Sequence, residues 1–398
     1  MLKPDTLALT VLLAFLTSLG PLSTDMYLPA LPSIAAELGA STGQAQLTLS
    51  VFLLGFAAGQ FVYGPVSDRV GRKPVLLFGL GLFTLASLVC AVSPSIETLI
   101  AARFVQALGA SGPIVLARAI VRDFYEGPRA GRELSRMGTI MGIVPAVAPV
   151  IGGLVTQAGG WRMNFIVTIL GGGVLAAAVA WRLPEPIRRK SPHPVSFPAI
   201  LKGFRTLLKH PGYRVYVGLA MLTYGGLFAF ISGSSFVLQG VYGLGQLPYA
   251  FSFGFMVLGY IAGTFLAQRL VGPRGLDGTI RIGVSCLAAG GLTMLLLVTL
   301  KIGSFMAVTG PMALYAVGVG LTMPQSMASA LMPFPERAGA ASSLLGICQM
   351  TFAAILGIVL GQNLGASALP LPLAIAGTGT LALALFAATG RARRAEAA

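Results

Sequence analysis

The chain has 398 residues, of which 55% are hydrophobic and 10% are charged, and its mean hydropathy is +0.83. Soluble domains carry about 25% charged residues, so this composition excludes a soluble globular protein. The net charge of +15 does not indicate nucleic-acid binding, because the basic residues gather in the turns between long apolar segments.

Apolar segments of about 20 residues follow one another along the whole chain, and each is long enough to cross the hydrocarbon core of a bilayer. They predict an all-α membrane protein with twelve transmembrane helices in two pseudo-symmetric six-helix bundles, an architecture common among transporters. The predicted spans are 7–29, 43–66, 75–93, 97–121, 134–157, 162–183, 214–240, 248–271, 280–299, 304–330, 339–363 and 369–389.

Asp25 stands out in the first predicted span, 7–29, because an ionised carboxylate within a membrane helix costs about 3 kcal/mol on insertion scales. Arg103 lies in the fourth span, and Gln106, three residues later, shares its helical face. If the spans meet the outer surface near Pro29 and Glu97, the two charged residues lie about 6 Å and about 9 Å inside it. This similar depth makes Asp25 and Arg103 candidate partners in one cavity, although depth alone does not decide whether they face each other.

A polar, basic, proline-rich stretch at 184–213 divides the spans into six before it and six after it. We predict an N-terminal bundle at 1–183, a basic cytoplasmic linker at 184–213 and a C-terminal bundle with a short cytoplasmic tail at 214–398. Within the linker, residues 199–209 are expected to form a short amphipathic helix on the inner leaflet.

Lys and Arg are distributed unequally between the two sides of the predicted spans. Only Arg162 and Lys301 lie at turns after odd-numbered spans, whereas the N-terminus, the even-numbered turns and the C-terminal tail carry most of the 27 basic residues. By the positive-inside rule, both termini are expected in the cytoplasm.

Residues that carry metal or catalytic chemistry are few and scattered. Both histidines, His193 and His210, fall in the predicted linker, where we expect them to be solvated. The three cysteines, Cys90, Cys286 and Cys348, fall in predicted spans without metal-ligand spacing. An enzyme site would need a cluster of such groups near one interface, so the sequence predicts no metal, no cofactor and no enzyme activity.

The walls of a substrate cavity are expected to be apolar and aromatic with a few polar groups. Taken alone, each candidate is better explained by ordinary helix packing than by ligand contact. The predicted substrate-binding residues are Tyr27, Gln106, Tyr224, Phe228, Phe236 and Gln349.

The turn at 64–73 reads Gly64-Pro65-Val66-Ser67-Asp68-Arg69-Val70-Gly71-Arg72-Lys73. It resembles the G-x-x-x-D-R-x-G-R-K loop between helices 2 and 3 of the major facilitator superfamily. The ordered Gly and Asp distinguish it from a generic basic loop. We expect its glycines to permit a tight turn and close helix approach.

Other stretches resemble the same superfamily. LIAARFVQALGA at 99–110 is similar to its helix 4 pattern with an intramembrane Arg, and GIVPAVAPVIGG at 142–153 is similar to its helix 5 antiporter motif, with Ala148 where Gly is usual. STDMYLPALP around Asp25, the pair Arg122-Asp123 and PERAGAASSLLG at 335–346 narrow the resemblance to the bicyclomycin/chloramphenicol-resistance (Bcr/CflA) branch of drug/proton antiporters.

The resemblance implies a proton-coupled multidrug efflux transporter of the bacterial cytoplasmic (inner) membrane, which exports small amphipathic or antibiotic-like molecules by alternating access. Its expected partners are protons, a small-molecule substrate and the lipid bilayer, and it is expected to be a monomer. The implied proton-coupling residues are Asp25 and Arg103, the cytoplasmic gate comprises Gly64, Asp68, Arg69, Gly71, Arg72 and Asp123, and the helix 5 motif comprises Gly142, Pro145, Pro149, Gly152 and Gly153.

Other functions remain open from the sequence. An exporter of a metabolite, such as an amino acid derivative, would use the same acid and helix kinks. A sugar or organic-acid symporter is disfavoured because the spans contain few Asn, Gln, Asp and Glu, and a non-transporting sensor is a further alternative.

Overall fold

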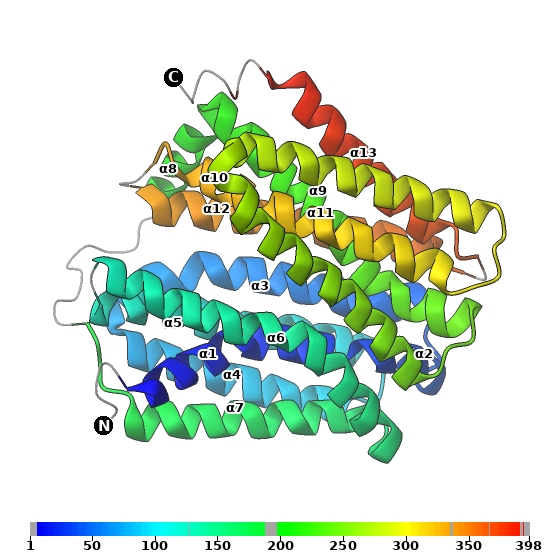
Figure 1. Ribbon diagram of the computed structural model, residues 1–398. Coiled ribbons are helices and arrows are strands. Elements are labelled where there is room, and N and C mark those ends of the chain that lie inside the picture. The colour runs from blue at the N-terminus through cyan, green and yellow to red at the C-terminus, as the bar shows by residue number, and fades with distance from the viewer. Residues whose placement is uncertain are drawn as a thin grey trace. The chain divides into compact units, whose positions relative to one another are not determined.

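The computed structural model describes residues 6–125, 127–187, 197–334, 337–365, 367–390 and 393. Within these ranges the regular secondary structure is entirely helical (Figure 1). Part of the predicted linker, 188–196, and the first two residues of the stretch at 335–346 lie outside the described residues.

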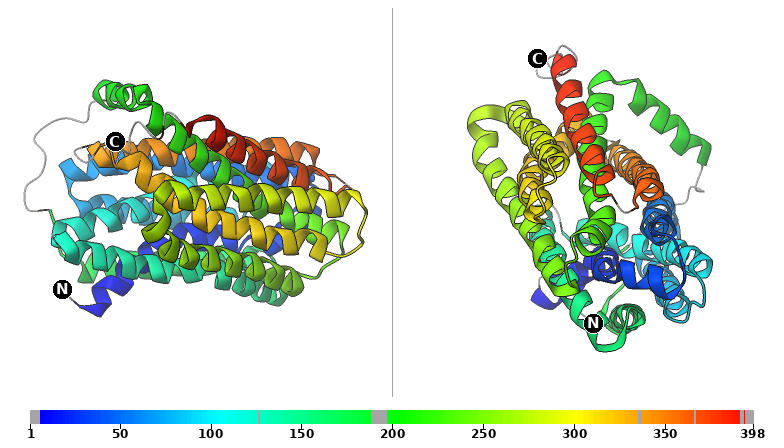
Figure 2. Two further views of the ribbon diagram at one scale, coloured as in Figure 1. Left: turned by 45° about the horizontal axis from the view of Figure 1, so that its top comes forward. Right: turned by 90° about the vertical axis from the view of Figure 1, so that its right-hand side faces the viewer.

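Contacts between the helices divide the chain into two compact units. The first unit comprises Met1–Ala40 and Val51–Val195, and the second comprises Ser41–Ser50 and Ser196–Ala398. Figure 2 shows the helices from two further directions.

The first unit is built from long helices joined by short connections. Its core contains apolar side chains from successive helices, including Leu16, Phe52, Leu80 and Phe83. In Figure 1, α4 and α7 lie side by side, as their contacts require. Its elements are α1 (Leu7–Asp25), the 3₁₀ turn η1 (Leu28–Ala30), α2 (Leu31–Glu37), most of α3 (Thr42–Val70), α4 (Arg72–Ala91), α5 (Ile96–Phe124), α6 (Gly127–Gly159) and α7 (Arg162–Arg182).

In the second unit, α9 packs against three other helices, α11, α12 and α13. Tyr315 of α11 shares a hydrogen bond of 3.2 Å with Thr378 of α13, and Gly226 of α9 leaves room for that pair, because a Cβ there would overlap the Tyr315 hydroxyl. The elements are α8 (Phe197–Lys209), α9 (Pro211–Ser235), the π-helical turn η2 (Phe236–Val241), α10 (Gln246–Thr299), α11 (Met306–Leu331), α12 (Ala338–Asn363) and α13 (Pro370–Ala388).

Eleven described helices are long and apolar enough to cross a membrane, one of which, α10, has 54 residues. That length corresponds to about 80 Å at 1.5 Å per residue, far more than one crossing needs. The backbone leaves helical geometry at Gly275, where φ is 66° and ψ is 179°. Its two arms, 246–274 and 276–299, correspond to the predicted spans 248–271 and 280–299, and the predicted multi-span all-α fold is confirmed.

The first membrane segment is longer than predicted. The sequence places its end at Pro29, but η1 and α2 extend the apolar segment to Glu37, so it covers 31 residues. Pro29 enters the 3₁₀ turn near its start, where its missing N–H does no harm. Asp25 therefore lies twelve residues, or about 18 Å, before the C-terminal end of this segment, and not about 6 Å.

The predicted turn at 64–73 is also mostly helical. α3 continues to Val70 and α4 begins at Arg72, so Gly71 alone connects them. Gly71 has a φ of 122°, a conformation that residues with a Cβ rarely adopt. Gly64 lies within α3 and nothing lies within 4 Å of a Cβ built there, so the expectation that Gly64 permits close helix approach is wrong.

Close contact between α4 and α5 depends on Gly109. A Cβ at Gly109 would overlap the backbone nitrogen of Phe83 and would lie 2.8 Å from the carbonyl oxygen of Gly79. Small residues allow membrane helices to approach closely, where packing rather than the hydrophobic effect drives association. The glycine therefore sets the spacing of the helices that carry Gln106 and Ser87.

We expect Gly109→Ala to lower the stability of the folded protein by roughly 1–3 kcal/mol, the usual cost of overpacking a tight interior. Thermal unfolding of the purified protein in detergent measures the change. Gly81→Ala in α4 is the matched control, since nothing lies within 4 Å of a Cβ at that position. Equal Tm values for both variants would contradict the close approach of α4 and α5.

Candidate functional site

Arg103 is the most deeply buried charged residue of the candidate site, with 0% of its surface exposed. Its Nη1 donates to Oε1 of Gln106 at 2.6 Å and to the carbonyl oxygen of Ser23 at 3.4 Å. Its Nε and Nη2 have no hydrogen-bond partner among the described residues. A buried guanidinium with unused donors is costly, so Arg103 is a candidate functional residue.

Aromatic rings surround the Arg103 guanidinium. Its central carbon lies 4.7 Å from the ring centroid of Tyr27, 4.3 Å from that of Phe52 and 5.9 Å from that of Phe165. The negative faces of aromatic rings attract a desolvated cation by about 2 kcal/mol in favourable cases. Tyr27 is itself 1% exposed, so the structure places this predicted substrate-binding residue against Arg103.

Gln106 is held in one orientation by α4. Its Nε2 donates to Oγ of Ser87 at 2.7 Å, and that hydroxyl donates to the carbonyl oxygen of Phe83 at 2.7 Å. The amide oxygen of Gln106 is therefore turned towards Arg103. In this structure Gln106 therefore positions the guanidinium, and its role in substrate binding stays a prediction.

Asp25 is the last residue of α1 and is 7% exposed. No hydrogen bond or ion pair to its carboxyl group occurs among the described residues. Ser23, whose carbonyl accepts from Arg103, lies two residues away. The structure thus brings Asp25 into the same region as Arg103 without an ion pair between them.

The helix 5 motif lies in α6, which contacts α1 and η1. Gly152 faces the chain directly after Asp25, because a Cβ at Gly152 would overlap the carbonyl oxygen of Met26. Gly153 and Pro149 are buried, whereas Gly142 and Pro145 are only half-buried. Nothing lies within 4 Å of a Cβ at Gly142, so only part of the motif contacts the acid-bearing segment.

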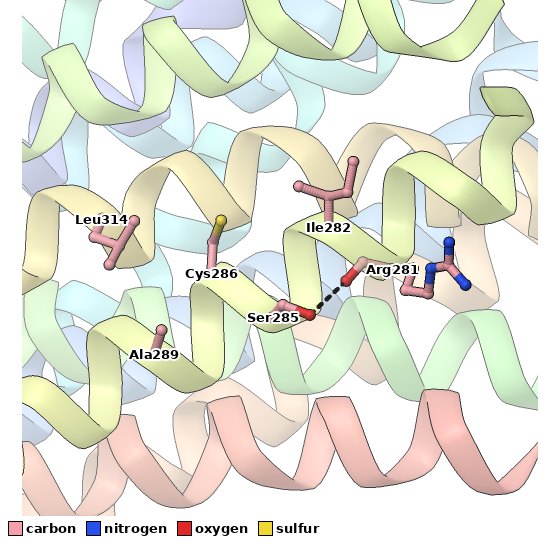
Figure 3. A pocket seen from close by; sticks show the side chains of 6 residues that line it. All are labelled: Arg281, Ile282, Ser285, Cys286, Ala289 and Leu314. Atoms are coloured by element: carbon pink, nitrogen blue, oxygen red, sulfur yellow. Dashed lines mark hydrogen bonds between the residues drawn. The ribbon is translucent and has the colours of Figure 1, made fainter. Parts of the chain in front are cut away.

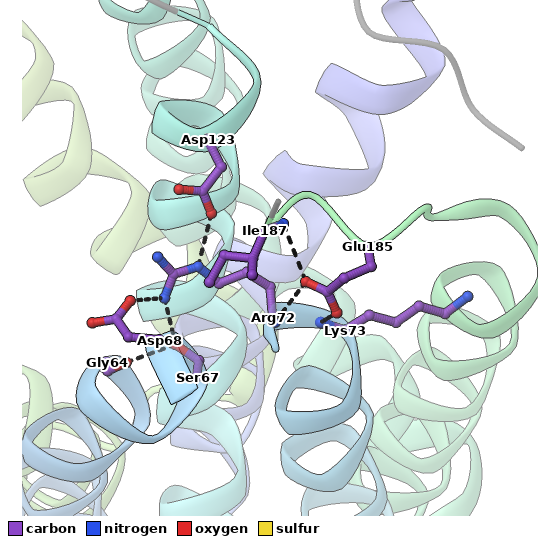
Figure 4. Close-up of polar contacts among 8 residues, drawn as sticks. All are labelled: Gly64, Ser67, Asp68, Arg72, Lys73, Asp123, Glu185 and Ile187. Atoms are coloured by element: carbon purple, nitrogen blue, oxygen red, sulfur yellow. Dashed lines mark hydrogen bonds and ion pairs between the residues drawn. The ribbon is translucent and has the colours of Figure 1, made fainter. Parts of the chain in front are cut away.

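A charge cluster lies where α3 ends, centred on Arg72 (Figure 4). Arg72 Nε lies 2.8 Å from Oδ2 of Asp123, and Nη1 lies 2.5 Å from Oδ1 of Asp68. Nη1 also donates to Oγ of Ser67 at 2.6 Å. The structure therefore brings together three of the predicted gate residues, Asp68, Arg72 and Asp123, whereas the Arg69 side chain is exposed.

Glu185 completes this cluster, and its role was not anticipated from the sequence. Its carboxylate accepts from the backbone N–H groups of Arg72 at 2.9 Å and Lys73 at 3.0 Å. These are N–H groups of the first turn of α4, which have no partner within the helix. A carboxylate there also meets the positive end of the helix dipole. The sequence contained one indication of this role, because Glu185 is an acid directly after the sixth predicted span and close to a basic turn.

Glu133 of α6 is a second acid that sequence reasoning missed. It is 8% exposed, its Oε2 accepts from Oγ1 of Thr10 at 2.6 Å, and its Oε1 accepts from Nη1 of Arg136 at 2.7 Å. The sequence placed Glu133 outside the spans, but α6 begins at Gly127. Unlike Asp25, this acid has partners.

The predicted binding residues of the second unit serve packing in this structure. Tyr224 and Phe228 stack on each other with ring centroids 6.4 Å apart. Gln349 donates to the carbonyl oxygen of Ala220 at 3.3 Å, and Phe236 begins the π-helical turn η2. Ala220, Tyr224 and Phe228 follow one another at intervals of four residues on α9, and a role of the four predicted residues in substrate binding remains a prediction.

These features define a membrane transporter built from packed helices around buried charged groups. The family model of the Major Facilitator Superfamily matches residues 13–358. The chain therefore belongs to the major facilitator superfamily.

Its relatives indicate the branch of that superfamily. The chain is 36% identical to an uncharacterized MFS-type transporter, YdgK, of Bacillus subtilis, over 90% of each chain. It is 31% identical to a bicyclomycin resistance protein homolog of Haemophilus influenzae, over 92% of each chain. It is 32% identical to a chloramphenicol resistance protein of Pseudomonas aeruginosa, over 85% of this chain and 80% of that one. These relatives confirm the resemblance to the Bcr/CflA branch.

The fold is also similar to solved transporters. A bacterial homolog of the human lysosomal transporter Spinster matches with a TM-score of 0.76 at 16% identity, over 100% of this chain and 99% of that one. At this identity the likeness concerns the fold alone.

We expect Arg72→Gln to lower stability by roughly 1–3 kcal/mol, because it leaves Asp123 without its cationic partner. Thermal unfolding of the detergent-purified variant measures this loss. Arg182→Gln, at the exposed end of α7 in the same unit, removes the same charge without breaking a contact of the cluster and should unfold like the unaltered protein. The cluster would have no stabilising role if both variants unfolded at the same temperature.

Proposed function

We propose that this transporter is a proton-coupled exporter of small amphipathic or antibiotic-like molecules, working by alternating access. The observation that carries the proposal is Asp25, an acid buried far from either end of its membrane segment and without a partner among the described residues. Ionisable residues at such positions mark proton relays in pumps and transporters.

Proton binding and release at Asp25 follow from its surroundings. An ionised carboxylate in this position is an uncompensated charge, whereas the protonated group is neutral and can donate a hydrogen bond. The unused Nε–H and Nη2–H groups of Arg103 offer the ionised form a partner if the end of α1 shifts. Release of the proton would therefore be accompanied by a local rearrangement of α1, which is the coupling that transport needs.

Two features support movement at this point of α1. The N–H of Tyr27 donates to the carbonyl oxygen of Thr24 at 3.2 Å, three residues back, and a 3₁₀ turn follows at Leu28–Ala30. Such tight turns within a longer helical segment often mark hinges. The contact of Met26 with Gly152 links any such movement to α6 and hence to the helix 5 motif.

The proton gradient supplies enough energy for this cycle. One elementary charge crossing about 150 mV releases about 3.5 kcal/mol. A free energy of this size supports a substrate gradient of a few hundred-fold. One proton per substrate molecule is therefore sufficient for useful export.

We also propose that the protein works as a monomer in the bacterial inner membrane with both termini in the cytoplasm. The excess of Lys and Arg at the N-terminus, the even-numbered turns and the C-terminal tail supports this orientation. It places the Arg72 cluster at the cytoplasmic side, where we propose that Gly64, Asp68, Arg69, Gly71, Arg72 and Asp123 form a gate. The amphipathic helix α8 would then lie on the inner leaflet.

In a host without its own efflux pumps, expression should lower the accumulation of amphipathic drugs, and Asp25→Asn should abolish this effect because the amide cannot carry the proton. Everted vesicles with an imposed pH gradient isolate the coupled step. The Asp25→Glu variant keeps an acid and should retain part of the activity. Gradient-driven efflux at the normal rate in Asp25→Asn would reject the assignment, and metabolite release without drug resistance would favour a metabolite exporter.

We expect Arg103→Ala to bring transport close to background while the protein still inserts into the membrane. The variant removes the donor to Ser23 and Gln106 and the partner proposed for ionised Asp25. Arg103→Lys keeps the positive charge within the aromatic rings and should restore part of the transport. Normal transport by Arg103→Ala would show that the guanidinium has no part in coupling.

A further inference from the structure

The second unit has a surface groove of about 430 Å³ along the second arm of α10, lined by Arg281, Ile282, Ser285, Cys286 and Ala289 together with Leu314 of α11 (Figure 3). We propose that this groove binds one anionic phospholipid, with its phosphate on Arg281 and part of an acyl tail along the apolar side chains. The position of the phosphate in the inner leaflet rests on the orientation proposed above.

The groove lies on an exposed face of the second arm of α10. Arg281, Ser285 and Ala289 are exposed and follow one another at intervals of four residues, which places them on one face of the helix. Leu292, Leu296 and Leu300 continue this face and are 49%, 56% and 64% exposed. An exposed apolar face of a membrane-spanning helix faces lipid tails.

The positions of the lining residues match the depth profile of a phospholipid. Arg281 lies about 9 Å along the helix from Gly275, where the backbone turns, and Ala289 lies about 12 Å further on. Half the thickness of the hydrocarbon core is about 15 Å. A phosphate at Arg281 therefore leaves the attached tail against Ile282, Ala289 and Leu314, while the Ser285 hydroxyl lies one turn from the cation.

Arg281 is available to an anion. Among the described residues, its guanidinium has no hydrogen bond or ion pair. Asp277, one turn earlier, is already engaged, because Arg393 Nη1 lies 2.5 Å from its Oδ2 and the Tyr216 hydroxyl donates to its Oδ1 at 2.9 Å. Basic pockets between membrane helices at the cytoplasmic side are typical sites for anionic lipid head groups. A second copy of this chain on the same face would take Arg281 out of water, which costs free energy unless that copy presents a carboxylate to it.

Cys286 provides a reporter inside the groove. Its thiol lines the groove and the residue is partly exposed, whereas Cys90 is buried. In a Cys348→Ser background, the rate at which N-ethylmaleimide alkylates Cys286 measures how much the groove is covered. Phosphatidylglycerol added to the detergent micelles should slow alkylation several-fold, and phosphatidylcholine at the same amount should not.

Variants separate the two parts of the site. Arg281→Gln should abolish the protection by phosphatidylglycerol and Arg281→Lys should retain it in part. Ala289→Trp fills the apolar end and should lower the number of phosphatidylglycerol molecules retained in native mass spectra although Arg281 is intact. Arg274→Gln is the matched control, since Arg274 is an exposed arginine at the end of the first arm of α10 and does not line the groove, and it should behave like the unaltered protein.

Several outcomes would overturn the proposal. They are equal protection by the two lipids, unchanged protection in Arg281→Gln, and equal protection by inorganic phosphate, which has no tail. Protection that rises with protein concentration in lipid-free detergent would assign the groove to a second copy of the chain instead.

Discussion

The candidate site depends on the burial of one guanidinium in a region without a paired carboxylate. Arg103 is fully buried, yet its contacts are a carbonyl, an amide oxygen and aromatic rings, all uncharged. Removing a cation from water costs several kcal/mol unless good partners compensate. The compensation requires α1, α3, α5 and α7 to keep their side chains around one point. The packing of these four helices and the placement of Asp25 near the guanidinium therefore both follow from the burial of Arg103.

Different interactions stabilise one end of the first unit and its interior. At the Arg72 end, charged groups satisfy helix ends: Glu185 accepts from the first turn of α4, and Arg72 joins acids of α3 and α5. In the interior, glycines such as Gly109 and Gly152 let backbones touch where no charge is available. Ion pairs are favourable at a hydrated surface, whereas close helix packing is favourable in a hydrocarbon environment. Each kind of interaction therefore lies in the environment that favours it.

Hydropathy and motifs predicted the helical fold and the family, and they identified Asp25 and Arg103 as charged residues within predicted spans, because apolar length and the position of charges are properties of local sequence. The extension of the first span through Pro29 was missed, since proline within an apolar run usually ends a helix, and here a 3₁₀ turn absorbs it. The roles of Glu185, Ser87 and the aromatic rings around Arg103 were also missed. These contacts join residues far apart in the chain, and single-sequence patterns do not encode such pairs.

Gly275 has a practical consequence for work with this protein. Because helical residues flank that glycine closely on both sides and Thr279 Oγ1 donates back to its carbonyl oxygen at 2.8 Å, the connection contains almost no extended backbone. Proteases and inserted epitope tags need such backbone, which is normally found at exposed loop tips. A fusion or cleavage site introduced there would break a helix rather than lengthen a loop. The bend at Gly275 is therefore a poor position for an inserted tag.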